Sequence, residues 1–167
     1  MKLTIENAKT FALKKFKELP ELLYQWNIYH TKGIIKALSI LGKTNERLTA
    51  LAWVHDIGKT ISDKDHAVHS VEILEKEFEL DNIDKDCILN HGSKSKPLTS
   101  EGKTFRYCDG LSLFMPEVIN FRFYIETKEG LSFEEIQEKI KKTYYKYNEA
   151  YSDNDKVINV LSSNFNQ

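Results

Sequence analysis

The most informative segment of the chain reads Leu51-Ala52-Trp53-Val54-His55-Asp56-Ile57-Gly58-Lys59. Four apolar residues directly precede a histidine and an aspartate, so the pattern predicts a buried helix that carries both polar side chains into the interior. Burying an ionised carboxylate is costly unless a hydrogen-bonded partner or a metal ion compensates its charge. A divalent metal ion provides that compensation, and it accepts this mixture of imidazole nitrogen and carboxylate oxygen.

The rest of the chain also favours helices. Only three prolines and seven glycines occur among 167 residues, and they fall between segments of helical periodicity. No alternating strand pattern extends beyond a few residues, and the sequence contains neither a repeat nor a linker. The sequence therefore predicts one all-α domain over 1–167, a bundle of about seven to nine helices.

Capping residues, glycines and prolines give the expected helix boundaries. In the first half we expect a helix from a Thr4 cap to about Leu19, a second from Glu21 to Leu41, and a third from a Thr44 cap to beyond His55. A fourth helix is expected to begin at Asp63 or Asp65, with Val68, Val71, Leu74 and Phe78 facing inward. A fifth should run from about Ile83 to Asn90. In the second half we expect a polar loop over 92–97, a helix with Phe105, Cys108 and Asp109 that continues or restarts after Pro116, a helix from a capping box at Ser132 to about Tyr147, and one over 155–161.

The composition narrows the class of protein. The formal net charge is −1, which gives no global basic field for nucleic acid, although a local basic patch is still compatible with it. No apolar run reaches the roughly 18–20 residues that span a bilayer, and the first residues turn polar too soon for a signal peptide. Cys87 and Cys108 sit in apolar surroundings and are predicted to be reduced, packed thiols. We expect a cytoplasmic protein with no membrane partner.

A histidine and an aspartate complete a potential metal site. His30 lies 25 residues before His55, and Asp109 lies 53 residues after Asp56, each on a predicted helix. A lone histidine on a helix is usually an ordinary core or surface residue, but four such groups that converge favour a metal centre. A ligand shell of imidazole nitrogens and carboxylate oxygens, with coordination positions left for water, suits manganese, iron, cobalt, nickel, zinc or magnesium.

The order His … His-Asp … Asp resembles the HD superfamily of metal-dependent phosphohydrolases. The resemblance covers about residues 28–112, and we expect the C-terminal helices over 115–163 to pack on this core. It implies a metal ion in a helical core, held by His30, His55, Asp56 and Asp109, and hydrolysis of phosphate esters. Asp56 would also orient the attacking water, and Lys59 would neutralise developing charge. The alternative for Lys59 is a solvated lysine at a helix C-terminus, which the helix dipole favours.

Two further histidines match positions that hold a second ion in two-metal HD enzymes. His66 begins a predicted helix and His91 ends the next one, but Gly92 follows where the richest two-metal pattern has another histidine. We therefore expect one firmly held metal ion, with His66 and His91 forming either a weak second site or a contact to substrate phosphate. His69, three residues past His66, is expected at the surface.

Basic residues near this motif are candidate substrate contacts. Lys94 and Lys96 lie in the polar loop after His91, and Arg106 lies one turn before Asp109. Lysine, arginine and hydroxyl groups beside a metal cleft suit a phosphate ester. A solvated loop is the alternative for the two lysines.

The expected function is hydrolysis of a phosphate mono- or diester, with a phosphorylated small molecule or nucleotide as substrate. Nucleic acid stays open as a partner, because one subclass of the family is the CRISPR-associated HD single-strand nuclease. A catalytically silent module that binds metal or nucleotide is the rival from another class. The absence of a Gly-Tyr-Pro element after the third histidine region argues against the cyclic-dinucleotide branch that bears it.

Overall fold

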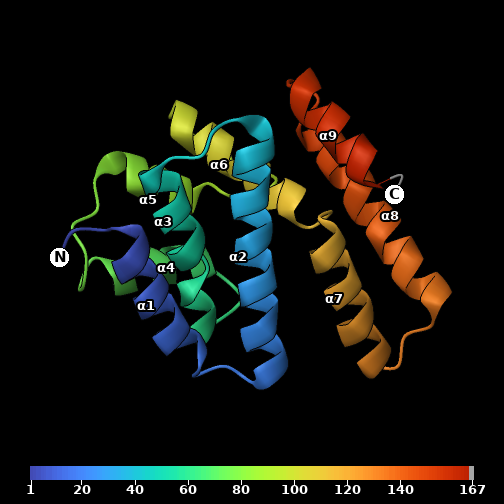
Figure 1. Cartoon of the computed structure of the whole chain (residues 1–167), viewed down its shortest axis with the longest axis horizontal. Coiled ribbons are helices and arrows are strands. Elements are labelled where there is room, and N and C mark those ends of the chain that lie inside the picture. The colour runs from blue at the N-terminus through green and yellow to red at the C-terminus, as the bar shows by residue number, and fades with distance from the viewer. Residues whose placement is uncertain (166–167) are drawn as a thin grey trace.

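The structure of the chain is a computed structural model that describes residues 1–165. Over these residues it consists of nine α-helices and one short 3₁₀ helix, η1, with no strand (Figure 1). They are α1 (Ile5–Phe16), α2 (Glu21–Leu41), α3 (Glu46–Val54), η1 (Ile57–Thr60), α4 (His66–Leu74), α5 (Asn82–Leu89), α6 (Ser100–Ser112), α7 (Pro116–Lys128), α8 (Phe133–Ala150) and α9 (Asp155–Phe165). The predicted all-α class is confirmed.

Helix α2 is the central element of the fold. It contacts α3, α6 and α7, and in Figure 1 it separates α1, α3, α4 and α5 from α7, α8 and α9. It ends at Gly42, which adopts the left-handed conformation with φ of 67° that glycine tolerates best, and whose amide donates to the carbonyl of Leu38. Because α2 touches both groups of helices, its side chains can reach any site formed between them.

The core joins the N-terminal helices to α6. Ile34, Leu51, Phe105 and Leu111 are fully buried, and each such side chain contributes roughly 1.5–3 kcal/mol when it leaves water. Cys87 and Cys108 are buried free thiols, as the sequence predicted. No helix within residues 1–165 is long and apolar enough to cross a membrane.

The C-terminal helices contact the rest of the chain through a few large side chains. Helix α7 contacts α2 and α8, while α9 contacts α6 and α8. Tyr147 on α8 and Tyr151 just after it are buried, and the Tyr151 hydroxyl donates to the carbonyl of Arg106 at 2.7 Å. This contact fixes the end of α8 against α6.

Several predicted helix boundaries in the first half were wrong. Helix α1 ends at Phe16 rather than near Leu19, and Asn45 rather than Thr44 caps α3, since its side chain accepts from the amide of Leu48 at 2.8 Å. Helix α4 ends at Leu74, so Phe78 is buried from the following turn.

Val68 was wrongly predicted to face inward. Its exposed fraction is 47%, because α4 buries Ser70, Val71 and Leu74 instead. Two residues subtend about 200° around a helix, which places Val68 opposite Ser70. The small Ser70 decides the buried face, because its hydroxyl accepts a hydrogen bond from the amide of Gly58 on η1.

Candidate metal centre

The four residues of the predicted metal set come together in the interior. His30 from α2, His55 and Asp56 after α3, and Asp109 from α6 are all buried. The His30 Nε2 atom lies 3.0 Å from Asp109 Oδ1 and 3.7 Å from Asp56 Oδ2. The His55 Nε2 atom lies 3.4 Å from Asp56 Oδ2 and 3.5 Å from Asp109 Oδ1. Two imidazole nitrogens therefore face two carboxylate oxygens.

The chain reaches this geometry by leaving the helix, and not along one helix as predicted. Helix α3 ends at Val54, His55 is its C-cap, and Asp56 has φ of −98° and ψ of 8°. The following 3₁₀ turn then brings Lys59 back, so that its Nζ lies 2.6 Å from Asp56 Oδ2. Lys59 is thus half-buried against the carboxylate and is not a solvated lysine at a helix end.

His66 and His91 approach the other oxygen of Asp56. The His66 Nε2 atom lies 3.2 Å from Asp56 Oδ1, and the His91 Nε2 atom lies 3.6 Å from it. His66 begins α4, and His91 follows directly after α5. The Asp56 carboxylate therefore lies between two groups of histidines, one at each of its oxygens. His69 is elsewhere, with its Nδ1 at 3.2 Å from Glu72.

All four histidines at Asp56 are oriented through their Nδ1 atoms. The Nδ1 acceptors are the Ser112 hydroxyl for His30 and the carbonyl oxygens of Ala52, Asp63 and Ile88 for His55, His66 and His91. Ser112 gives its own proton to the Asp109 carbonyl at 2.6 Å, so it accepts from His30. A neutral imidazole whose Nδ1 donates carries its lone pair on Nε2, the atom that binds metal ions.

This donor set fits a divalent metal ion. Within the described residues, the buried His55 Nε2 and Asp56 Oδ1 atoms have no hydrogen-bond partner, and such orphaned groups are costly without a ligand. Three overlapping sets of residues each bring three donor atoms within 4.8 Å of one another. The sets are His30, His55 and Asp56; His55, His91 and Asp109; and Asp56, His66 and His91. Nitrogen and oxygen donors in this ratio suit the transition metals and magnesium named above.

The charges in the site favour ionised carboxylates. Burial alone raises the pKa of Asp56, but His55, Lys59, His66 and His30 outweigh it and hold that pKa well below its ordinary value. Burial likewise opposes ionisation of Asp109, but the imidazoles of His30 and His55, whose Nε2 atoms face its Oδ1, bring its pKa below the usual range. Burial lowers the pKa of Lys59, yet the Asp56 carboxylate raises it more, so the ammonium stays charged. The centre therefore presents two carboxylates and one cation.

A pocket of about 400 Å³ opens onto these residues. Lys59 and Lys94 line it, so one of the two loop lysines is at the site. Sequence reasoning missed four further lining residues, which are Trp26, Leu113, Lys146 and Tyr147. The position of Trp26 could have been predicted from the sequence, because it lies four residues before His30 and so on the same helix face. The position of Lys146 could not, because only the packing of α8 brings this residue to the pocket.

Two of the predicted substrate contacts are not at the pocket. Lys96 is exposed and does not line it, because the loop has turned away toward Pro97, which is buried. The Arg106 side chain points at the main chain instead: its Nη2 donates to the carbonyls of Ser93 at 2.6 Å and Ala150 at 3.0 Å. The guanidinium thereby ties the loop to the end of α8.

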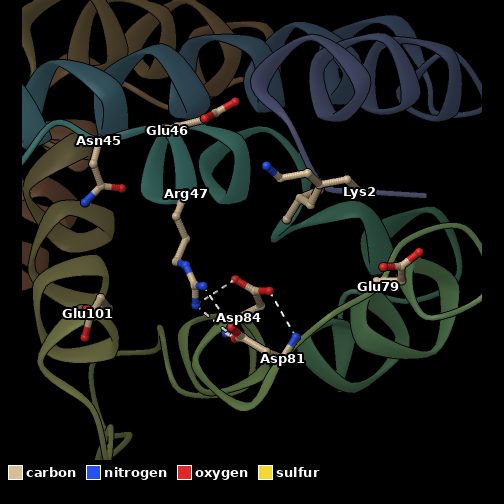
Figure 2. A pocket seen from close by; sticks show the side chains of 9 residues that line it. Lys2, Asn45, Glu46, Arg47, Glu79, Asp81, Asp84 and Glu101 are labelled. Carbon is tan, nitrogen blue, oxygen red and sulfur yellow. Dashed lines mark hydrogen bonds and ion pairs between the residues drawn. The ribbon is translucent and has the colours of Figure 1, made fainter.

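A second pocket, of about 490 Å³, lies away from the histidines and carries different chemistry. Figure 2 shows Arg47 pointing at Asp81 and Asp84 from the start of α3. The Arg47 guanidinium contacts Asp81 at 2.9 and 2.8 Å, and Asp81 and Asp84 also form the capping box of α5. These acids are thus engaged in ion pairing and capping, and no group of metal-ligating atoms within residues 1–165 includes them.

Comparison with known proteins identifies the family. The family model described as "HD domain" matches residues 27–113, slightly more than half of the chain. The matched segment contains His30, the His55-Asp56 pair, His66, His91 and Asp109. No curated protein and no solved structure matches the chain significantly. HD domains form a superfamily of metal-dependent phosphohydrolases, and the His/Asp groups described above can hold such a metal ion. The chain belongs to the HD domain family.

Proposed function

We propose that the protein is a metal-dependent hydrolase of a phosphate mono- or diester, with a nucleotide or nucleic-acid-derived substrate. One observation carries the proposal: histidine Nε2 atoms face both oxygens of the buried Asp56 carboxylate beside an open pocket. A carboxylate in that position can serve two neighbouring cation sites. Catalytic centres concentrate perturbed and unsatisfied groups in this way.

The residues divide into two sets of ligands. His30, His55, Asp56 and Asp109 would hold the first ion, and His66 and His91 with Asp56 Oδ1 would hold a second. A divalent ion held there would acidify a bound water and polarise a phosphoryl oxygen. Asp56 would accept a hydrogen bond from that water.

Lysines around the pocket support an anionic substrate. Lys59 comes from η1, Lys94 from the loop after His91, and Lys146 from α8. Three ammonium groups from three elements converge on one opening, which suits phosphate oxygens. Lys59 also neutralises charge that develops on the phosphoryl group, because it lies at the carboxylate that holds the ions.

Two alternatives make different predictions in the same assays. A CRISPR-associated type of single-strand nuclease would cut single-stranded DNA, and the His66–His91 pair favours such two-metal diester chemistry. A silent binding module would take up metal ion or nucleotide without turnover. The complete ligand set favours activity.

A substrate panel with one matched pair of variants tests the proposal. The substrates are p-nitrophenyl phosphate, bis-p-nitrophenyl phosphate, nucleotides and single-stranded DNA, each with manganese, nickel, cobalt and magnesium. We expect metal-dependent turnover that Asp56→Asn lowers by about 100-fold or more, since it removes a buried charge from the reacting centre. Asp65→Asn is the control, because Asp65 is exposed and its φ of 59° suits asparagine.

Two outcomes would contradict the proposal. Full activity in Asp56→Asn, with helicity retained in both variants, would overturn the assignment of Asp56. Inactivity of the parent protein on every substrate would favour the silent module.

A further inference from the structure

A second groove continues the metal pocket. It has a volume of about 420 Å³ and lies among α2, α7 and α8. Trp26, Leu113, Lys146 and Tyr147 line both the groove and the metal pocket. A ligand that reaches the histidines can therefore extend past these four side chains into the groove.

The near end of the groove is aromatic and apolar. The Trp26 indole is parallel to the His30 ring, with an interplanar angle of 4° and centroids 6.2 Å apart. Leu23 and Ile125 line the groove beyond it. The indole is thus held beside a residue of the metal centre, where a flat group attached to a phosphate would meet it.

The far end of the groove carries a fixed guanidinium. Arg122 Nε donates to Glu126 Oε1 at 2.7 Å, and its Nη1 donates weakly to the Thr143 hydroxyl at 3.4 Å. The Lys139 ammonium lies 3.3 Å from Glu126 Oε2, so the carboxylate is held from both α7 and α8. Glu126 thereby orients the Arg122 guanidinium at the groove wall.

We propose that this groove binds the nucleobase of a nucleotide whose phosphate lies at the metal centre. The proposal rests on the proposed phosphohydrolase function and specifies its substrate. Aromatic side chains bind bases through stacking, and a guanidinium donates to acceptors on base edges. A purely aliphatic group would offer no hydrogen-bond acceptor to the Arg122 guanidinium at the groove wall. Helices α7 and α8 lie outside the matched residues 27–113, so they would add substrate selection to the family's metal centre.

Binding without turnover tests the groove directly. Trp53 is replaced by Phe so that Trp26 is the remaining tryptophan, and fluorescence is titrated with AMP or with ribose 5-phosphate in the presence of a chelator. The two probes share the sugar and phosphate and differ in the base. We expect AMP to quench Trp26 and to bind about 10- to 100-fold more tightly than ribose 5-phosphate. Equal affinity for the two probes would overturn the proposal.

Matched variants locate the base. Arg122→Gln, which lies outside the metal pocket, should reduce the preference for AMP toward unity while leaving ribose 5-phosphate binding unchanged. Trp26→Ala, measured by calorimetry, should weaken binding of AMP more than binding of ribose 5-phosphate. Tyr124→Ala is the control, because Tyr124 is an exposed aromatic of α7 outside the groove. An AMP preference that survives both groove variants would place the base elsewhere and contradict the proposal.

Failure of the groove and failure of the phosphohydrolase function give different results. Turnover of p-nitrophenyl phosphate with no AMP preference would overturn the base subsite alone. An AMP preference that depends on Arg122, in a protein that hydrolyses none of the panel substrates, would support the groove and overturn the hydrolase.

Discussion

The Nε2 atoms of His66 and His91 lie 3.1 Å apart, although the residues belong to different helical segments. The Nδ1 atoms of both donate to carbonyl oxygens, so in the neutral state two Nε2 lone pairs face each other. The Asp56 carboxylate, whose Oδ1 atom lies 3.2 Å from His66 Nε2, raises the pKa of His66, whereas burial lowers the pKa of His91. His66 is therefore the more basic of the two, and a proton taken up at its Nε2 would satisfy the pair in the absence of a metal ion. A cation between the two nitrogens would replace that proton.

Metal content should report whether this pair binds a second ion. We expect about one ion per chain after dialysis against a chelator, and about two at saturating metal concentration. His91→Ala should lower the saturated value to one, as measured by elemental analysis. His69→Ala is the control, because His69 pairs with Glu72 and should leave both values unchanged.

Two other outcomes of that measurement would correct the assignment. A metal content of one in the parent protein, with a raised KM in His91→Ala, would assign His66 and His91 to substrate phosphate. Two ions retained after the chelator would show that the second site is as tight as the first.

Arg106 offers a test of how the pocket is held together. Arg106→Lys keeps the charge but loses the planar fork that reaches the Ser93 and Ala150 carbonyls together. We expect the free energy of unfolding to fall by about 1.5–3 kcal/mol. The KM for phosphate substrates should rise more than kcat falls, because the loop that carries Lys94 loosens while the metal ligands stay.

The matched control for Arg106 is Arg47→Lys. The Arg47 side chain pairs with the exposed Asp81, and exposed pairs contribute at most about 1 kcal/mol. Comparable losses in both variants, measured by denaturant unfolding, would show that the main-chain contacts of Arg106 stabilise the protein no more than an exposed ion pair does.

The sequence predicted the helices and the metal set because both depend on local pattern and residue type. Helical periodicity of the apolar residues predicted α2 and α8. The apolar turn before the His55-Asp56 pair indicated that Asp56 is buried. The sequence did not predict that α3 stops at Val54, because the close approach of η1 to α4 is a tertiary contact. It also did not predict Lys146 or the inward main-chain contacts of Arg106, which depend on how α8 packs over the pocket.

The two cysteines should be unreactive in the folded protein. Burial raises the pKa of the Cys87 thiol from 9.0 to about 12, and that of Cys108 likewise to about 12. A disulfide-exchange reagent at pH 8 should label neither native thiol and should label both in denaturant. An added exposed thiol, Ser163→Cys, is the positive control. Rapid labelling of Cys87 in the native state would contradict its burial.

The same shift sets a pH dependence of stability. Cys87 ionises near pH 9 when unfolded and near pH 12 when folded, so the folded state holds the proton more tightly. Its contribution to the free energy of unfolding is complete below pH 9 and is lost as the pH rises from about 9 toward 12. Cys87→Ala should flatten the stability profile in that window, as measured by denaturant unfolding at each pH.

Within the His-Asp-Ile-Gly-Lys segment, Gly58 occupies a position where packing leaves no room for a side chain. A Cβ atom there would collide with the carbonyl oxygen of His66 and would lie 2.6 Å from the amide nitrogen of Ser70. Both obstacles are backbone atoms of α4, so they cannot rotate away. Gly58→Ala must therefore push η1 from α4, which separates Asp56 from His66.

We expect Gly58→Ala to lower the free energy of unfolding by about 1–3 kcal/mol, the usual cost of overpacking, and the melting temperature by about 2–4 °C for each kcal/mol. Gly92→Ala is the control, because its Cβ would meet only the Ser95 hydroxyl, at 3.3 Å. The Gly58 variant should also lose metal uptake at the His66–His91 pair before it loses uptake at His30 and Asp109, because the displaced contact carries His66. Thermal unfolding and elemental analysis measure the two effects. A Gly58→Ala protein as stable as Gly92→Ala would show that η1 and α4 do not need this close approach.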